Sequence, residues 1–255
     1  MALLEIKNIR MCYHSLKTET EAIKNVSFDV NDKDFLSILG PSGCGKSTLL
    51  NIMSGLLNQS SGTVTFDGDN IRNNLDKIGY MFQKDHLFDW TSVWNNVTLG
   101  LKIKGLLNDE TIARVETLLS NYELTKFKDH KPTELSGGMR QRVALIRTLA
   151  LNPKILFLDE PFSALDYQTR LNICDEMFSI IKQEGKTAIM VTHDISEAVS
   201  ISNRIIVLTK RPALVKKEVN ISFKNNNLTP FNRRKENEFK EYFDLLWKEL
   251  DDYND

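Results

Sequence analysis

The segment GPSGCGKST, residues 40–48, decides how this sequence is interpreted. It fits the pattern G-x-x-x-x-G-K-[ST] and lies between a short apolar run, FLSIL at 35–39, and a helical stretch at 47–57. Glycines let the backbone curl so that successive amides point at phosphate oxygens, and the positive end of the following helix adds to the attraction. We therefore expect a phosphate-binding loop between a buried strand and a helix.

The residues of this loop have distinct expected contacts. Lys46 is expected to reach the β- and γ-phosphates of a nucleotide, and the Ser47 hydroxyl is expected to ligate Mg²⁺. Cys44 is interpreted as the source of a backbone amide rather than as a catalytic thiol, because no base is evident near it. The loop residues expected to bind nucleotide are Gly40, Pro41, Ser42, Gly43, Cys44, Gly45, Lys46, Ser47 and Thr48.

A second segment, ILFLDEP at 155–161, supplies acidic side chains. Its apolar residues predict a buried strand that delivers two carboxylates at its carboxyl end, where open α/β sheets bind ligands. Asp159 is expected to hold Mg²⁺ through water. Glu160 is expected to orient or deprotonate an attacking water molecule.

Short apolar runs alternate with helical stretches along the rest of the chain. Strands are expected at 3–9, 26–30, 35–39, 62–68, 155–159, 187–193 and 205–208. Helices are expected at 47–57, 109–122, 137–151 and 167–184. This alternation predicts an α/β fold with a largely parallel sheet. The block from about 85 to 150 has almost no strand signal, so we expect it to form a separate helical lobe.

Composition narrows the function classes. With 33 Lys+Arg against 34 Asp+Glu, the net charge of −1 argues against a nucleic-acid partner bound through bulk charge. The cysteines Cys12, Cys44 and Cys174 are odd in number and widely spaced, which argues against a disulfide framework or a zinc site and favours a reducing compartment. No signal peptide and no membrane-spanning apolar run is evident, so another chain would have to hold the protein at a membrane.

The segment LSGGMRQR at 135–142 begins a helix with two glycines. A glycine pair costs backbone entropy, so something must require bare, closely approachable amides there. Ser136 is a candidate N-cap, and Gly137 and Gly138 would expose the first helical amides, which together form an anion site without a cationic side chain. Arg140 and Arg142 are interpreted either as supporting an interface at this site or as simply solvated.

With these motifs in place, the chain resembles the ATP-binding subunit of an ABC (ATP-binding cassette) transporter over residues 3–210. The resemblance implies a P-loop NTPase (RecA-like) core with an N-terminal antiparallel β subdomain and an inserted α-helical subdomain. It divides the chain into a nucleotide-binding core, 1–84 and 151–222, a helical subdomain with the signature motif, 85–150, and a C-terminal linker and amphipathic helix, 223–255.

The resemblance also implies roles for single residues. Gln83, in YMFQ, would contact Mg²⁺ and the attacking water; His193, in VTHD, would contact the γ-phosphate; Tyr13 would stack on adenine. Taken alone, Gln83 would be a solvated loop residue, His193 a structural histidine and Tyr13 a strand-edge aromatic. The implied reaction is that of an ATPase, ATP + H2O to ADP + phosphate, with catalytic residues Glu160, His193 and Gln83.

A dimer follows from the same resemblance. Ser136, Gly137 and Gly138 would bind the γ-phosphate of ATP held by the phosphate loop of a second copy, and Asp166, in SALD, would cross between subunits. Two copies would sandwich two ATP molecules, so that ATP favours the closed dimer and hydrolysis removes that stabilisation.

The segment KDHLFDWTSVWNNVTLGL, 84–101, would face an integral membrane permease. Its pattern resembles the importer subfamily for nitrate, sulfonates and taurine, in which an extracytoplasmic solute-binding protein feeds the permease and the ATPase is peripheral on the cytoplasmic face. Asp89 and the pair Lys33-Asp34 depart from that subfamily's pattern. Trp90 and Trp94 could instead be simple packing residues. A membrane-associated ATPase of an efflux or division complex, and a soluble non-transport ABC ATPase, remain alternatives.

The C-terminal tail has its own periodicity. Residues 231–250 place Phe239, Phe243, Leu246 and Leu250 on one helical face, which predicts packing back onto the core.

Overall fold

The computed structural model describes residues 2–14, 18–225 and 227–251. The strands are β1 (Leu4–His14), β2 (Glu19–Val30), β3 (Phe35–Leu39), β4 (Ser61–Phe66), β5 (Asp69–Asn70), β6 (Ile78–Met81), β7 (Ile155–Asp159), β8 (Thr187–Thr192), β9 (Arg204–Leu208) and β10 (Ala213–Asn220). The α-helices are α1 (Lys46–Met53), α2 (Val93–Ile103), α3 (Asp109–Asn121), α4 (Gly137–Leu149), α5 (Tyr167–Gln183), α6 (Ile195–Ile201), α7 (Pro230–Arg233) and α8 (Asn237–Asp251). Short 3-10 helices occupy Ile71–Lys77, Thr125–Phe127 and Pro132–Glu134.

All ten described strands join one curled sheet in the order β5-β4-β1-β2-β10-β9-β3-β8-β7-β6. The half containing β3, β9, β8, β7 and β6 is parallel, whereas β1, β2, β4 and β5 pair antiparallel. Strand β10 joins the halves, antiparallel to β9 and parallel to β2. The predicted α/β fold, with its parallel core and N-terminal antiparallel part, is confirmed.

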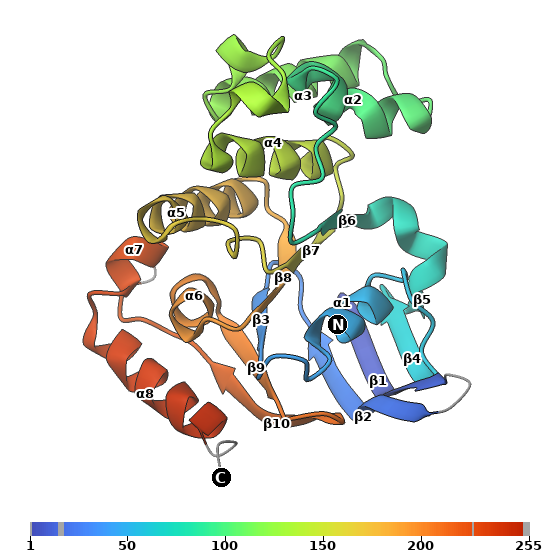
Figure 1. The fold of residues 1–255 in the computed structure, drawn as a ribbon, viewed down its shortest axis with the longest axis vertical. Coiled ribbons are helices and arrows are strands. Elements are labelled where there is room, and N and C mark those ends of the chain that lie inside the picture. The colour runs from blue at the N-terminus through green and yellow to red at the C-terminus, as the bar shows by residue number, and fades with distance from the viewer. Residues whose placement is uncertain (1, 15–17, 226, 252–255) are drawn as a thin grey trace.

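The parallel strands are apolar runs because both of their faces are covered. Every residue of β3, β8 and β9 is buried, as expected for a strand between two layers of helices. Helices α5 and α6 lie on one side of these strands and α1 on the other (Figure 1). The expected helix at 47–57 ends earlier, at Met53, because Gly55 turns the chain at φ 76°.

Helices α2, α3 and α4 form a layer of their own beyond the edge of the sheet (Figure 1). They share a core with one side of the sheet, and their buried residues include Val97, Leu119 and Ile146. Ser92 begins α2 by accepting a hydrogen bond from the backbone N–H of Asn95 at 3.2 Å. The helical lobe is therefore present, while the exact division of the chain into subdomains stays a prediction.

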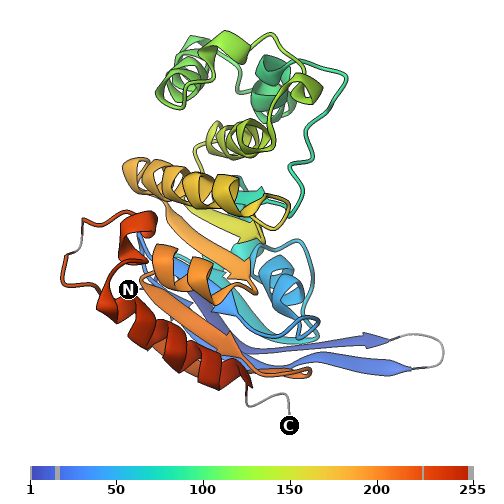
Figure 2. The ribbon, with the colours of Figure 1, turned by 60° about the vertical axis from the view of Figure 1, so that its left-hand side comes forward.

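The C-terminal helix α8 packs on β9, β10 and α6, as Figure 2 shows. Leu246 is fully buried there, and Phe239, Phe243 and Leu250 are partly buried in the same cluster, as the periodicity predicted. Residues 252–255, the end of the predicted C-terminal segment, lie outside the described residues. Within the described ranges, none of the helices is long and apolar enough to cross a membrane.

Candidate functional site

Residues 40–45 form a tight loop between β3 and α1, and residues 46–48 begin α1. Gly45 has φ 115°, a conformation that side chains rarely adopt, and a Cβ atom there would lie 3.1 Å from the carbonyl oxygen of Ala22. Gly43 also has a positive φ, 72°, and open space around it. The glycines therefore allow the left-handed turns that bring the loop over the start of α1.

The Lys46 side chain is folded into this loop. Its ammonium group donates hydrogen bonds to the carbonyl oxygens of Gly40 at 2.8 Å and Pro41 at 2.9 Å, and the residue is only 6% exposed. These two bonds hold the positive charge beside the loop amides, so cation and amides converge on the same place.

The acidic carboxyl end of β7 is hydrogen-bonded directly to the phosphate-loop segment. Ser47 Oγ donates a hydrogen bond to Asp159 Oδ1 at 2.9 Å. Burial raises the pKa of the Asp159 carboxyl, the Ser47 bond opposes this, and the neighbouring Glu160 charge raises it further. Two oxygen groups expected near Mg²⁺ are thus in contact, although they lie more than 100 positions apart in the sequence.

Glu160 lies between two other expected site residues. Its Oε2 accepts a hydrogen bond from Gln83 Nε2 at 3.2 Å, and its Oε1 lies 3.3 Å from His193 Nδ1. The Glu160 backbone has φ 44°, a left-handed conformation that costs free energy outside glycine, and its N–H donates to the carbonyl of Val191 at 3.0 Å. A carboxylate positioned by a carboxamide and an imidazole, on a strained backbone, is suited to accepting a proton.

A cavity of about 320 Å³ lies over these groups. It is lined by Ser42, Gly43, Gly45, Lys46, Ser47, Thr48, Glu160 and His193. Tyr13, at the end of β1, is 44% exposed, and its hydroxyl lies 3.3 Å from the Thr48 hydroxyl. The ends of β1 and β2 project beyond the rest of the sheet on this side (Figure 2). The structure thus gathers residues from 13 to 193 around one opening.

The signature segment does not reach this cavity. Ser136 begins α4 by accepting a hydrogen bond from the backbone N–H of Met139 at 3.3 Å, but no residue of 135–142 lines the opening. A Cβ atom on Gly138 would lie 2.9 Å from Ile173 Cδ1, whereas one on Gly137 would make an ordinary contact of 3.4 Å with Leu165. Close packing of α4 against α5 at Ile173 is therefore a second reason for a glycine at position 138, and the expected contact of Gly137 and Gly138 with a ligand stays a prediction.

Asp166, expected to cross between subunits, is the N-cap of α5 in this chain. Its side chain accepts a hydrogen bond from the backbone N–H of Thr169 at 3.0 Å, and this bond lowers the pKa of the carboxyl. The residue is exposed, and it is absent from the cavity lining.

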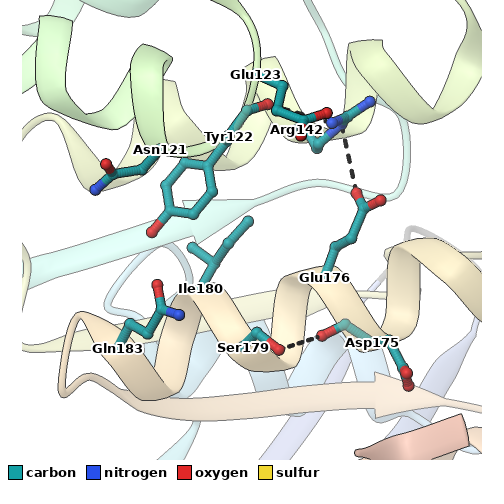
Figure 3. A pocket seen from close by; sticks show the side chains of 9 residues that line it. All are labelled: Asn121, Tyr122, Glu123, Arg142, Asp175, Glu176, Ser179, Ile180 and Gln183. Atoms are coloured by element: carbon teal, nitrogen blue, oxygen red, sulfur yellow. Dashed lines mark hydrogen bonds and ion pairs between the residues drawn. The ribbon is translucent and has the colours of Figure 1, made fainter.

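The two arginines of the signature form ion pairs and hydrogen bonds within the chain. Arg140 makes paired contacts with Asp85, at 2.7 and 3.0 Å, and a further one of 3.0 Å with Asp89. The departure at Asp89 thus has a partner inside the chain. Arg142 donates to the carbonyl of Tyr122 at 3.2 Å and lies 3.4 Å from Glu176 of α5 (Figure 3). A solvated role for Arg140 and Arg142 is therefore wrong.

The sequence analysis did not identify two residues of the site, Tyr80 and Ser163. The Tyr80 hydroxyl, from β6, donates to Asn51 Oδ1 at 2.8 Å and approaches Asp159 Oδ2 at 3.4 Å. Ser163 accepts from Gln83 at 3.3 Å and donates to the Glu160 carbonyl at 3.0 Å. Burial raises the pKa of Tyr80, and the nearby Asp159 charge raises it further, so this phenol stays a donor. Strand β6 carried no strand pattern, so nothing pointed to Tyr80.

The chain that carries this arrangement is similar to known proteins. A family profile described as ABC transporter matches residues 23–163, more than half of the chain. The chain belongs to the ABC transporter family. It is an ABC-type ATPase, as the resemblance predicted.

Individual relatives agree with this ABC assignment. The chain is 44% identical over 250 residues to an uncharacterized ABC transporter ATP-binding protein, YtlC, of Bacillus subtilis, covering 98% of this chain and 96% of YtlC. It is 37% identical to the nitrate import ATP-binding protein NrtD of Synechocystis, covering 95% and 93%. It also superposes on the dimeric post-hydrolysis cassette MJ0796 bound to ADP and Pi with a TM-score of 0.74, at 35% identity, covering 86% and 99%.

The one cysteine in this ABC phosphate loop allows a simple test. Burial raises the pKa of the Cys44 thiol, which keeps it from acting as a nucleophile. Replacing Cys44 with alanine should therefore leave ATP hydrolysis by the purified chain within about threefold of the original rate. A Lys46→Ala chain, measured in parallel by phosphate release, should lose hydrolysis. A Cys44→Ala chain as inactive as Lys46→Ala would show that the thiol takes part.

Proposed function

We propose that this chain is the ATP-hydrolysing motor subunit of an ABC importer, which dimerises on ATP and drives solute uptake through a separate permease. The observation that carries the catalytic half is the position of Glu160, held by Gln83 and His193 at the mouth of the loop cavity. In that position the carboxylate can accept the proton of a water molecule that attacks the terminal phosphate.

The residues around the loop fit a magnesium nucleotide. Ser47 offers a hydroxyl, Asp159 a carboxylate and Gln83 an amide oxygen, and hard oxygen ligands of this kind are what Mg²⁺ prefers. Bound Mg²⁺ would neutralise charge on the phosphates. Lys46 and the loop amides would bind the β- and γ-phosphates, and exposed Tyr13 would stack on the base.

The dimer is supported by the position of the signature segment. None of its residues, 135–142, lines the loop cavity of its own chain, and Ser136 and Gly137 at the start of α4 are exposed. A second copy arranged head to tail would bring its α4 N-terminus to the phosphates. The similar cassette MJ0796 was solved as a dimer with ADP and Pi.

A permease docking site is supported by a groove between β6 and α2. This groove, of about 360 Å³, is lined mainly by apolar residues that include Phe82, Leu99 and Ile103. Phe82 is 45% exposed and Ile103 is 76% exposed. Trp90, in the segment 84–101, is also largely exposed, which disfavours its interpretation as a packing residue. Such exposed apolar surface is typical of an interaction site.

We infer the importer type and the location of the chain from these features and from the similar import ATP-binding proteins. The nitrate-import relative aligns over nearly the whole chain, and we infer a permease of the nitrate, sulfonate or taurine type, fed by an extracytoplasmic binding protein. The chain would then be peripheral on the cytoplasmic face of the membrane. An efflux or division complex, or a soluble partner, are the alternatives that co-purification separates.

A single substitution tests the docking groove. Ile103→Lys should abolish co-purification of the tagged chain with a polytopic membrane protein from mild-detergent extracts, because a charge enters an apolar contact. ATP hydrolysis by the isolated chain should change less than about twofold, since Ile103 lines the groove and not the loop cavity. Leu56→Lys, at an exposed leucine outside the groove, is the matched control and should keep the partner.

Identification of the partner by mass spectrometry decides between the functions. A permease lost only in Ile103→Lys supports the importer. A cell-wall enzyme, an efflux assembly or ribosomes recovered in its place would contradict it.

A further inference from the structure

A separate cavity of about 310 Å³ lies at the amino ends of the parallel strands, opposite the phosphate loop. It is bounded by Phe35 at the start of β3, by Lys186 just before β8, and by Asn203 just before β9. We call it the basal cavity. None of the motif residues lines it, and its size is in the range of small-molecule sites, roughly 300–1,000 Å³.

The inner wall of the basal cavity is apolar. Ile181 and Ile201 are buried, and the rings of Phe35 and Phe178 lie 6.3 Å apart. An apolar wall of this kind favours a ligand with a hydrocarbon or aromatic body.

The rim of the basal cavity is cationic. Its charged lining residues are Lys33, Lys182, Lys186 and Arg233, with no carboxylate among them. Throughout residues 2–14, 18–225 and 227–251, no ion pair joins any of these four to an acidic side chain. Lys186 donates a hydrogen bond to the amide oxygen of Asn152 at 2.6 Å, and Glu184 is the acidic residue whose charge acts on it. Four positive groups around one apolar cavity favour an anion between them.

Arg233 is the most constrained of these cations. Its guanidinium carbon lies 5.0 Å from the Phe178 ring centroid and 5.2 Å from that of Phe223. One terminal nitrogen donates to the carbonyl of Ser200 at 3.0 Å, while Nε is buried without a hydrogen-bond partner. Burial lowers the pKa of Arg233. A half-buried, incompletely paired guanidinium favours an anionic ligand.

The position of Arg233 is fixed by the packing of the helix that carries it. It ends α7, which packs on α5 and α6 (Figure 1). The backbone N–H of Phe231, at the start of α7, donates to Asp175 of α5 at 2.6 Å. The aromatic contacts and this bond give the basal cavity a preformed cationic group on one side.

We propose that the basal cavity binds a small amphipathic anion, a carboxylate or sulfonate carried on an apolar body. The apolar part would contact Phe35, Phe178 and Ile201, and the anionic part would lie between Arg233 and the lysines of the rim. This site is independent of the ATP site and of the permease groove, with which it shares no lining residue.

Titration calorimetry with benzenesulfonate as the probe tests the proposal on the full chain. ADP is added first, so that the phosphate loop does not take up the probe. We expect one probe molecule bound per chain. Benzylammonium, which has the apolar body without the negative charge, and methanesulfonate, which has the charge without the body, should each bind at least about tenfold more weakly.

Two substitutions locate the binding. Arg233→Gln should weaken benzenesulfonate binding at least about tenfold, because a charge-assisted hydrogen bond is lost. Lys182→Gln, at an exposed position, should weaken it severalfold, and Lys126→Gln, at another exposed lysine in the helical lobe, should not. Absence of binding, equal binding of benzylammonium, or unchanged affinity in both Arg233→Gln and Lys182→Gln would each overturn the proposal.

Discussion

Replacing Glu160 with glutamine should slow ATP hydrolysis at least about 100-fold, which is about 2.7 kcal/mol of activation free energy. The amide keeps the size of the side chain and an oxygen that can still accept the hydrogen bond from Gln83 Nε2, now 3.2 Å from the carboxylate. It removes the negative charge and the ability to take a proton. The geometry of the site should therefore survive while the chemical step fails.

ATP binding should persist in the same variant. In the proposed site Lys46, Ser47 and the loop amides would bind the phosphates, and the hydrogen bonds of Lys46 and Ser47 described above do not involve Glu160, so nucleotide affinity measured by fluorescence titration should stay within about threefold. Because ATP is bound but not cleaved, the dimer should accumulate and elute earlier in size-exclusion chromatography with ATP than with ADP.

A matched control keeps this result specific. Glu110→Gln removes the same charge from an exposed position in the first turn of α3 and should hydrolyse ATP at the original rate. If Glu160→Gln hydrolysed ATP nearly as fast as Glu110→Gln, Glu160 would not be the base.

The fold was predictable where buried strands leave a clear apolar pattern in the sequence. Strands such as β3 and β7 are covered on both faces, so an uninterrupted apolar run marks each of them. Strand β10, with the sequence ALVKKEVN, carries charged residues because much of it is only half-buried, and it was missed. Strand β2 begins at Glu19, well before the predicted 26–30, inside a polar stretch, because its first part is held by pairing with β1 rather than by burial.

The site was predictable to the extent that its residues belong to contiguous motifs. Loop, acidic strand end and His193 each lie at the end of a marked strand, and the parallel sheet brings those ends together. Tyr80 contacts Asp159 and Ser163 contacts Gln83. These partners are distant in the sequence, so no local sequence pattern predicts the contacts. The close approach of Gly138 to Ile173, 35 positions away, is another contact between distant residues that no local pattern predicts.

The signature segment carries the second large prediction, because its position in the structure favours action on another copy. Ser136→Arg should abolish hydrolysis, since a long cation replaces the small cap at an α4 N-terminus that must approach phosphates closely. Nucleotide affinity of the monomer should stay within about threefold, because no residue of 135–142 lines the loop cavity of its own chain.

Loss of the cap itself needs a control. Substituting an N-cap serine costs roughly 0.5–2 kcal/mol of stability. Ser92→Arg removes an equivalent cap, that of α2 in the same helical layer, whose bond to Asn95 is 3.2 Å. It should lower stability comparably while the isolated chain keeps its ATPase activity. Equal loss of hydrolysis in both variants would reduce the Ser136 effect to damage of the helical layer.

Mixing two inactive chains distinguishes action within one chain from action between two. If Ser136 serves the partner's ATP, a dimer of Ser136→Arg with Lys46→Ala contains one intact site, built from the loop of the first and the signature of the second. Hydrolysis should then reappear on mixing, at roughly a quarter of the original rate, because about half of randomly formed dimers are mixed and each has one of two sites. If Ser136 instead serves its own loop, no site in any dimer is intact and mixing restores nothing. The exposed cap of α4, which does not line the cavity at Lys46 of its own chain, leads us to expect recovery.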